Sequence, residues 1–501
     1  MPRKQPEQST GQISRLSELT YITFAERAEL GRARRKVTPR SAHGDWSPPT
    51  GRDMLALLRA SNEGRVANLV PIRHARMIAS PFTFYRGAPA VMAYDLAHTP
   101  SSGIVAQLCG DCHISNFGMF ASPERALVFD LNDFDETLPG PFEWDVKRTA
   151  ASIVVAARNA EIDEDDAREA VALAVRVYRE KMHEFARRGY LDTWYSHTEA
   201  DVFLQMVEKK HRKTASTRLA RVQQRDRLRA FAKLTEVVDG QRRIIHDPPL
   251  LYRLEKHESA TREWLTELFK TYYESLEDSR KRLLSRYRLV DLAHKVVGVG
   301  SVGTRCFVSY WEGGTEDDPL FLQIKQANPS LLEPYLGHSE YEYPGQRVVT
   351  GQRLMQATSD IFLGYTHSGG HDYFVRQLYD MKGAANLDTI PAPYLVRYAA
   401  LCGAVLARAH ARSGDPAEIA GYLGTSNGFD KALVEFAFRY ADQNDADYAA
   451  FKQAVAEGSL EARTEDHAKT GTETRKKAVP AKDKPASGTS VNGAPVKVKG
   501  E

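Results

Sequence analysis

The sequence predicts an α+β protein of two lobes, in which a helical lobe comes first along the chain and a β-rich lobe second. Three observations predict this arrangement. Polar and acidic residues are concentrated between Leu108 and Glu136, and long helical patterns follow them. A glycine-rich segment, Gly298 to Gly303, then opens a series of strand-like runs. A further helical segment, Tyr394 to Arg412, comes after these runs, and we expect it to return to the first lobe.

The first 50 residues are polar and basic, with the runs Arg32-Ala-Arg-Arg-Lys36 and Pro39-Arg40. We predict a basic N-terminal arm over residues 1–50, either extended or placed as a strap facing phosphate groups. A charge run of this kind is also typical of a solvated surface segment. The sequence leaves both interpretations open.

The helical lobe is expected over residues 51–285. Asp145 is expected to cap a helix from Val146 to Asn159, and Asp163 to cap another that runs to about residue 188. Acidic residues open the second helix and basic residues close it, in agreement with the helix dipole.

Residues 209–233 carry many Lys and Arg among a few apolar residues. This pattern indicates a solvated amphipathic helix. A docking surface for an anionic substrate is the alternative interpretation.

The acidic cluster has the spacing of a phosphotransferase site. Asp111 and Asn116 have the D-x-x-x-x-N spacing that phosphotransferases of the protein-kinase type use for a catalytic carboxylate and a magnesium ligand. Asp133 lies where a second metal-binding aspartate would follow. Asp130 competes for that role, because Phe129-Asp130-Leu131 resembles the same motif, and we favour Asp133.

Each of these residues has an expected role. Asp111 would orient or deprotonate an acceptor hydroxyl. Asn116 and Asp133 would hold Mg²⁺, which prefers hard oxygen ligands. His113 either takes a direct catalytic part or forms a hydrogen bond within the loop. Asp145 is expected to brace the loop rather than to touch substrate.

The β-rich lobe is expected over residues 286–385. Its glycine segment offers Gly298, Gly300, Ser301 and Gly303, whose backbone N–H groups would bind the phosphates of ATP. Strand-like runs follow, and the run Leu320-Phe-Leu-Gln-Ile-Lys325 ends in a lysine placed to hold the α- and β-phosphates. Without that lysine, a simple bend between two strands would be the better interpretation.

Further features of this lobe complete the expected nucleotide site. Tyr373 to Leu378 is predicted to be a hinge strand, in which Gln377 and Leu378 would meet the edge of the adenine. A glutamate should pair with Lys325, and the sequence leaves three candidates open: Glu333, Glu340 and Glu342.

The order of the two halves is reversed relative to ordinary kinases, in which the phosphate-binding strands precede the catalytic loop. We therefore predict a circularly permuted kinase-like fold. The helix from Tyr394 to Arg412, within returning helices over residues 386–455, should pack beside the segment that leads to Asp111. Residues 456–501 have almost no aliphatic bulk, and we expect a disordered tail.

The composition fits a globular intracellular protein. Of the 501 residues, 42% are hydrophobic and 27% are charged, and the net charge is +3. No apolar run approaches the roughly 18 to 20 residues that span a bilayer, and the N-terminus has no apolar signal core, so we expect a cytoplasmic location. Four cysteines do not make a disulfide framework, and the near-neutral charge makes nucleic acid an unlikely partner.

Several long runs together resemble the bacterial family known as domain of unknown function 2252, over roughly residues 30 to 455. The runs are Ser80-Pro-Phe-Thr-Phe-Tyr-Arg-Gly87, the Gly-Asp-x-His-x-x-Asn-Phe-Gly motif from Gly110, Phe129-Asp-Leu-Asn-Asp-Phe-Asp-Glu136, Gly140-Pro-Phe-Glu-Trp-Asp-Val-Lys-Arg148 and Lys295-Val-Val-Gly-Val-Gly-Ser-Val-Gly-Thr-Arg305.

The catalytic motif also resembles, more distantly, that of aminoglycoside and choline kinases, which reads His-Gly-Asp-x-His-x-x-Asn. Gly110, Asp111, His113 and Asn116 match, whereas Cys109 replaces the leading histidine. This resemblance implies an ATP- and Mg²⁺-dependent phosphotransferase. The acceptor, a small molecule or a protein, stays open, as does transfer of a nucleotidyl group.

Three other interpretations carry less weight. Cys109-Gly-Asp-Cys112 has the C-x-x-C spacing of a redox or zinc site, but the intervening aspartate suits phosphotransfer better. A metal-dependent phosphoesterase would need further histidine ligands in a motif that the sequence lacks. A non-catalytic nucleotide-binding or scaffold protein is the remaining alternative.

Overall fold

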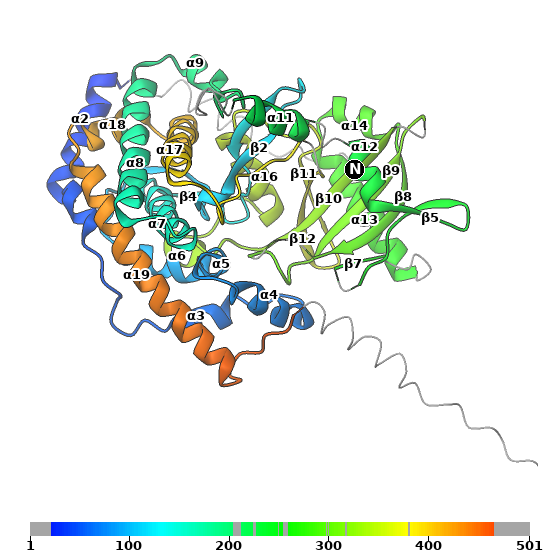
Figure 1. The fold of residues 1–501 in the computed structure, drawn as a ribbon. Coiled ribbons are helices and arrows are strands. Elements are labelled where there is room, and N and C mark those ends of the chain that lie inside the picture. The colour runs from blue at the N-terminus through cyan, green and yellow to red at the C-terminus, as the bar shows by residue number, and fades with distance from the viewer. Residues whose placement is uncertain are drawn as a thin grey trace, which may run out of the picture.

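The structure, a computed structural model, describes residues 22–203, 212–223, 227–248, 250–253, 259–296, 298, 300–315, 318–378 and 381–464. The chain is a mixed helix and sheet protein with one six-stranded sheet and three two-stranded sheets in this described part. Figure 1 shows most of the helices on one side of the molecule and the largest sheet on the other. The α+β class predicted from the sequence is therefore confirmed.

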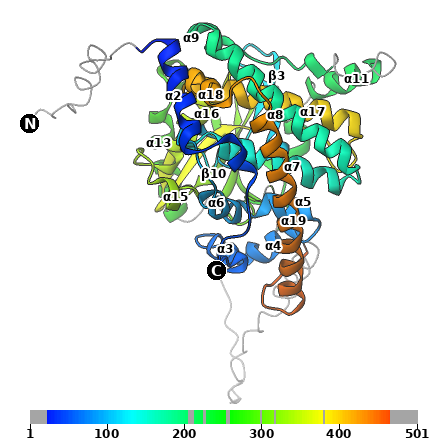
Figure 2. The ribbon, with the colours of Figure 1, turned by 90° about the vertical axis from the view of Figure 1, so that its left-hand side faces the viewer.

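The predicted N-terminal arm is helical over much of its described length, not extended. Helix α2 (Phe24–Val37) begins at a capping box in which Thr23 and Glu26 bond each other's backbone N–H groups. It packs on α18 (Pro416–Leu423), as Figure 2 shows, and Arg35 donates a hydrogen bond of 2.7 Å to the Tyr422 carbonyl. Residues before 22, and any part they would play in a strap, lie outside the described residues.

A series of short helices follows α2. The segments are η1 (Arg40–Gly44), α3 (Met54–Ala60), η2 (Ala67–Leu69), α4 (Val70–Met77), α5 (Pro81–Gly87) and α6 (Pro89–Ala97). The first, η1, packs on the start of α19 (Gly428–Ala456), and α3, α4, α5 and α6 pack around its far end. Apolar residues of these four helices share a cluster with Phe451 and Leu460.

Two antiparallel strand pairs carry the acidic cluster. Strand β1 (Val105–Leu108) pairs with β4 (Leu138–Pro141), and β2 (Phe117–Ala121) pairs with β3 (Leu127–Leu131). The short helix η3 (Ile114–Asn116) leads into β2. The loops after β1 and β3 are therefore held close together.

The helical core consists of α7 (Glu143–Asn159), α8 (Glu164–Arg187), α17 (Ala392–Ser413) and α19. The predicted bounds of α8 and α17 are confirmed within a residue or two. The predicted start of α7 is wrong, because the helix begins two residues before Asp145 and the carboxylate of that residue does not cap it. The side chain is instead bonded to another loop.

Helix α17 returns from the far end of the chain to the segment before Asp111, as expected. It packs along α8 and touches β1. The Tyr398 hydroxyl donates a hydrogen bond of 2.9 Å to the Phe117 carbonyl at the start of β2. Close approach to α8 requires glycine at residue 403, since a Cβ there would lie 2.2 Å from the Ala174 carbonyl oxygen.

The basic stretch of residues 209–233 is helical where it is described. It contains α11 (Arg212–Gln223) and α12 (Arg227–Leu234), preceded along the chain by α9 (Tyr190–Tyr195). Leu219 and Val222 are buried, whereas Lys213 is exposed. The predicted amphipathic character is thus confirmed for α11, whereas Leu228 of α12 is exposed.

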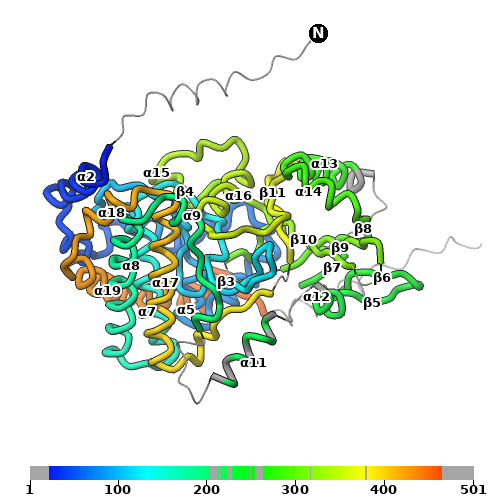
Figure 3. The backbone as a smooth tube through the Cα atoms, turned by 90° about the horizontal axis from the view of Figure 1, so that it is seen from above, coloured from blue at the N-terminus to red at the C-terminus, as the bar shows by residue number. Residues whose placement is uncertain are grey.

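The largest sheet is antiparallel and has the order β11-β12-β10-β9-β8-β7. Its strands are β7 (Leu251–Arg253), β8 (Arg288–Lys295), β9 (Cys306–Glu312), β10 (Pro319–Ala327), β11 (Gly364–Ser368) and β12 (His371–Gln377). Helices α13 (Ser259–Ser275) and α14 (Asp278–Leu284) cover one face, and α12 lies on the other, beside the pair β5 (Thr235–Val238) and β6 (Gln241–Ile244), as Figure 3 shows.

The two faces of β10 explain the position of its lysine. Side chains alternate along a strand. Leu322 and Ile324 belong to the cluster under α13, so Gln323 and Lys325 point to the opposite face. Helices α15 (Glu333–Leu336) and α16 (Pro344–Met355) follow β10 and connect it to β11.

The predicted tail begins later than residue 456. Leu460 is buried, the Glu461 carbonyl oxygen lies 2.7 Å from His74 Nδ1, and the Arg463 N–H donates to the Pro71 carbonyl at 3.0 Å. Residues 465–501 lie outside the described part. No helix among the described residues is long and apolar enough to cross a membrane.

Candidate functional site

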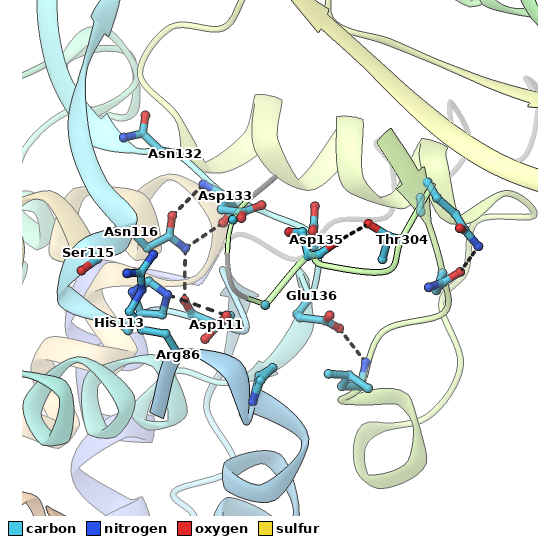
Figure 4. A pocket seen from close by; sticks show the side chains of 18 of the residues that line it. Arg86, Asp111, His113, Ser115, Asn116, Asn132, Asp133, Asp135, Glu136 and Thr304 are labelled. Carbon is cyan, nitrogen blue, oxygen red and sulfur yellow. Dashed lines mark hydrogen bonds and ion pairs between the residues drawn. The ribbon is translucent and has the colours of Figure 1, made fainter. Parts of the chain in front are cut away.

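One cavity brings together the two sequence motifs. It has a volume of about 770 Å³ and is lined by residues of the acidic cluster and of the glycine turn between β8 and β9 (Figure 4). The predicted site residues that line it are Asp111, His113, Asn116, Asp133, Gly298, Gly300 and Ser301.

The loop that carries Asp111 is held by the start of α7. Asp145 accepts hydrogen bonds from the N–H groups of Cys109 at 2.6 Å and Gly110 at 3.0 Å. Gly110 has a φ of +86°, and a Cβ there would lie 2.3 Å from the Glu136 carbonyl oxygen. The predicted bracing role of Asp145 is therefore confirmed.

Asp111 is partly exposed to the cavity and has a buried cationic partner. Arg148, on α7, donates from Nε to Asp111 Oδ1 at 2.6 Å and forms an ion pair with the same carboxylate through its second amino group. The guanidinium lies 4.6 Å from the centroid of the Tyr85 ring. This pair fixes the direction of the Asp111 carboxylate.

His113 lies beside Asp111, with 3.9 Å between His113 Nε2 and Asp111 Oδ2. Burial lowers the pKa of His113 to about 4, although Asp111 acts in the opposite direction. The imidazole is therefore neutral at pH 7. Its Nδ1 is buried and has no hydrogen-bond partner within the described part of the chain.

The buried side chain of Asn116 joins the two acidic loops. Its amide donates to the carbonyls of Asp111 at 3.1 Å and Asp133 at 3.0 Å. Its Oδ1 accepts the N–H of Asp133 at 2.7 Å. The amide of this predicted magnesium ligand thus braces the loops, and Oδ1 retains one lone pair.

Asp133 and Lys325 meet although they lie far apart in the sequence. Lys325 Nζ is 3.6 Å from Asp133 Oδ1 and also forms an ion pair with Asp135. The ammonium group is buried, and the two carboxylates raise its pKa against the effect of burial. Burial and the neighbouring Asp133 carboxylate raise the pKa of Asp135.

Lys325 pairs with aspartates and not with Glu333, Glu340 or Glu342. Helix α16, which follows β10, contains no acidic residue. Its buried Arg347 donates instead to three carbonyls of the surrounding loops, those of Thr137 at 2.6 Å, Asp135 at 2.7 Å and Asn328 at 2.8 Å. A cation on α16 therefore fixes the loop that supplies the anionic partners of Lys325.

Asp130 does not line the cavity. Its carboxylate forms a buried ion pair with Arg408 of α17 and accepts the N–H of Ala357 at 2.9 Å. Asp130 therefore holds β3 to α17, and the structure does not support it as a metal ligand.

The glycine turn lies against the segment that follows α3. Arg65 donates to the carbonyls of Gly300 at 2.8 Å and Val302 at 2.7 Å, and the N–H of Val66 donates to the Gly303 carbonyl at 2.7 Å. Gly303 has a φ of +91° and does not line the cavity. Within the described part of the chain, the backbone N–H groups of residues 300–303 donate no hydrogen bond.

The expected adenine-binding donors are already bonded. The Gln377 N–H donates to the Asp360 carboxylate, and the Leu378 N–H donates to the Phe321 carbonyl at 2.9 Å. Leu378 is buried in an apolar cluster, and neither residue lines the cavity. The strand itself is confirmed as β12, but its role as a hinge for adenine is not supported.

Several residues in or beside the cavity were not assigned by sequence reasoning. Asp135 and Arg86 line the cavity, and Arg148 does not line it but pairs with Asp111. All three lie within the runs that carry the family resemblance, but those runs did not assign them a role. Arg376 donates at 3.0 Å to the Asn132 carbonyl and at 3.0 Å to Gln323 Oε1. Burial, reinforced by Arg376, lowers the pKa of Lys382 to about 7.

The C-x-x-C spacing does not form a redox or zinc site here. Both Cys109 and Cys112 are buried free thiols, and burial raises the pKa of each. Cys109 Sγ donates to the Asp133 carbonyl at 3.0 Å. No group of three or more His, Cys, Asp or Glu placed to hold a metal occurs among the described residues.

The chain is thus an α+β protein in which a carboxylate cluster and a glycine turn share one polar cavity. Its residues 65–454 match the family described as an uncharacterized protein conserved in bacteria (DUF2252), and the chain belongs to that family. No curated protein and no solved structure matches it.

Proposed function

We propose that this protein is an ATP- and Mg²⁺-dependent phosphotransferase with a circularly permuted kinase-like fold. The observation that carries the proposal is the contact between Lys325 and Asp133 beside a glycine turn. Only the folded chain brings these three features together, as a triphosphate site requires. Asp133 and the glycine turn line the cavity, and the buried Lys325 contacts Asp133 without lining the cavity itself.

The order of elements supports the permutation. Two strands flank the glycine turn, a third carries Lys325, and the helices α15 and α16 and two more strands follow, which resembles the order in the phosphate-binding half of a kinase. The returning helix α17 packs against β1, which leads to the catalytic loop. The helix that precedes the catalytic loop in an ordinary kinase would thus correspond to α17, which follows the β-rich half in this chain.

The carboxylates fit a magnesium ion. The Oδ1 atoms of Asp133 and Asp135 are buried and accept no hydrogen bond within the described part of the chain. Mg²⁺ in phosphotransferases is held by one or two carboxylates, with phosphate oxygens and waters completing its shell, so a larger cluster of protein ligands is not required. The ion would neutralise charge on the phosphates.

Each residue around the ATP would have a distinct role. The N–H groups of Gly300 and Ser301, which line the cavity, would donate to phosphate oxygens, and Lys325 would supply positive charge nearby. Asp111, directed by Arg148, would accept the proton of the acceptor hydroxyl. Neutral His113 would provide a hydrogen bond rather than a charge.

The test is titration of the purified protein with ATP, with and without Mg²⁺, by isothermal calorimetry. Mass spectrometry then detects self-phosphorylation or self-adenylylation. We expect Mg²⁺-dependent ATP binding that Lys325→Met weakens by roughly 10-fold or more and that the exposed control Lys270→Met leaves unchanged. Absence of ATP binding by the wild-type protein would exclude the proposal.

Nucleotide binding without turnover is the second candidate. It is favoured by Asn116, whose amide and one lone pair are occupied within the protein. Wild-type ATP binding with neither ATP consumption nor self-modification would support this alternative.

A further inference from the structure

One cation that lines the cavity, Arg86, has no acceptor for its charge within the described part of the chain. Arg65 and Arg376, which line the same cavity, donate to carbonyl or amide oxygens. Within the described part of the chain, Arg86 has no hydrogen-bond acceptor and no ion-pair partner, and its Nε is buried. Arg86 is partly buried, and a guanidinium with a buried N–H that has no acceptor is costly, so this side chain is expected to bind a ligand.

The position of Arg86 is fixed by the short helix α5. A capping box between Ser80 and Thr83 starts the helix, and the hydroxyl of Tyr85 donates to the Arg148 carbonyl at 2.8 Å. The Arg86 guanidinium lies 5.9 Å from the centroid of the Phe82 ring. The side chain is thus presented from a packed element.

Arg86 lies on the same side of the cavity as Asp111. Figure 4 shows it next to His113 and Asp111. Burial lowers the pKa of Arg86, and the carboxylates of Asp111, Asp388 and Asp133 oppose this shift. Because Arg148 already pairs with Asp111, Arg86 is left available for an anion from outside the protein.

The main chain of Arg86 also adjoins the glycine turn. A Cβ on Gly300 would lie 3.2 Å from the Arg86 carbonyl oxygen. An anion bound by the Arg86 side chain would therefore lie within reach of a phosphate held by the turn. The cavity volume of about 770 Å³ is in the range of sites for small molecules.

We infer that the acceptor is a low-molecular-weight hydroxyl compound that carries a carboxylate or a phosphate, and that Arg86 binds this anionic group. The inference rests on the proposed phosphotransferase function. It names the class of acceptor and assigns Arg86 as a specificity-determining residue for it. Arg86 holds the anionic group while the hydroxyl of the same compound faces Asp111.

The proposed phosphoryl transfer breaks one bond, forms one bond and moves one proton. The bond between the γ-phosphorus of ATP and the β,γ-bridging oxygen breaks, and the electron pair leaves with ADP. The acceptor hydroxyl oxygen forms the new bond to phosphorus, and its proton passes to the Asp111 carboxylate.

The experiment compares three probes that share a glycerol skeleton: neutral glycerol, glycerate and glycerol 3-phosphate. Binding of each is measured by saturation-transfer NMR with protein saturated with Mg²⁺ and a non-hydrolysable ATP analogue. We expect the anionic probes to bind more tightly than glycerol. Arg86→Gln should weaken their binding by roughly 10- to 100-fold, and Arg86→Lys should retain part of it.

Arg59→Gln, which changes an exposed arginine on α3, is the matched control and should behave as wild type. Equal binding of neutral and anionic probes, or undiminished anion binding by Arg86→Gln, would overturn the inference and leave the proposed function standing. Weakened binding of the ATP analogue to Arg86→Gln would assign Arg86 to the nucleotide, and would also overturn it. No analogue binding by wild type would overturn the proposed function itself.

Discussion

Two aspartates of the acidic cluster share a local sequence pattern but have different roles in the structure. Asp130 and Asp133 both lie in the run from Phe129 to Glu136. Asp130 lies on β3 and is neutralised by Arg408, whereas Asp133 lies beyond the strand and faces the cavity. One carboxylate therefore stabilises the fold, and the other is available for chemistry.

Substitutions separate these two roles. Asp133→Asn should reduce ATP turnover by on the order of 10²-fold or more and weaken its Mg²⁺ dependence, with folding retained. Asp111→Asn should reduce turnover to a similar degree. ATP consumption and circular dichroism measure both properties, and wild-type turnover in both variants would remove these residues from the mechanism.

Asp130→Asn is expected to act on stability. Removing one partner of a buried ion pair leaves the Arg408 charge uncompensated, which costs about 3 to 5 kcal/mol. Urea unfolding measures this loss. If Asp130→Asn proves as stable as Asp133→Asn, the ion pair with Arg408 does not hold β3 to α17.

At the scale of elements, close contacts between backbones decide how the helices meet. Helices α2 and α18 approach at Gly31 and Gly421, where a Cβ would lie 1.9 Å from the Glu418 carbonyl oxygen and 2.1 Å from the Ala28 carbonyl oxygen, respectively. Such an approach between two helices is possible only with glycine on both sides. The described part of the N-terminal segment is in this way part of the folded body.

Gly421→Ala tests this contact. The added methyl group must displace α2, and overpacking of this kind costs about 1 to 3 kcal/mol. Thermal unfolding should show the loss, whereas Gly314→Ala, at a position with nothing within 4 Å of the added Cβ, should not. Equal melting temperatures for the two variants would show that α2 does not depend on this approach.

At the scale of the whole molecule, the C-terminal segment and the buried histidines affect global stability. Residues 457–464 pack against α4: Leu460 is buried in an apolar cluster there, and the Glu461 carbonyl oxygen lies within hydrogen-bond distance of His74 Nδ1. His43 is fully buried, and its Nε2 lies 2.6 Å from the Tyr422 hydroxyl. Both features link segments that are distant in the sequence.

Two truncations locate the end of the folded part. Deletion of residues 457–501 should lower the melting temperature by several degrees, because it removes the buried Leu460 and the bonds to Pro71 and His74. Deletion of residues 465–501 keeps these contacts and should have little effect. Identical melting temperatures for the two truncated proteins would contradict a structural role for residues 457–464.

Stability should fall as the pH falls below about 6.5. Burial lowers the pKa of His43 far below its usual value and lowers that of His294 to about 4. Below about pH 6.5 the unfolded chain therefore binds protons that the folded chain excludes, and each such histidine contributes up to about 1.4 kcal/mol per pH unit. Urea unfolding at pH 7.5, 6 and 5 measures the slope, and His43→Gln should make it shallower. An unchanged slope in His43→Gln would refute the assignment.

The sequence by itself determined the local features of this protein. The helix patterns gave α8 and α17 within a residue or two, since periodic apolar residues and terminal charges depend only on neighbours in the chain. The glycine turn, the strand that ends near Lys325 and the brace from Asp145 were also predictable, because each follows from a short motif.

Only the tertiary structure decided which distant groups meet. It brought Lys325 to Asp133 and Asp135, turned Asp130 toward Arg408, and used the backbone donors of Gln377 and Leu378 within the sheet. These outcomes depend on how strands and helices pack across the molecule, and no local period encodes that packing. Arg86 shows the same limit, because its lack of an acceptor within the described part of the chain depends on where all the neighbouring charges lie.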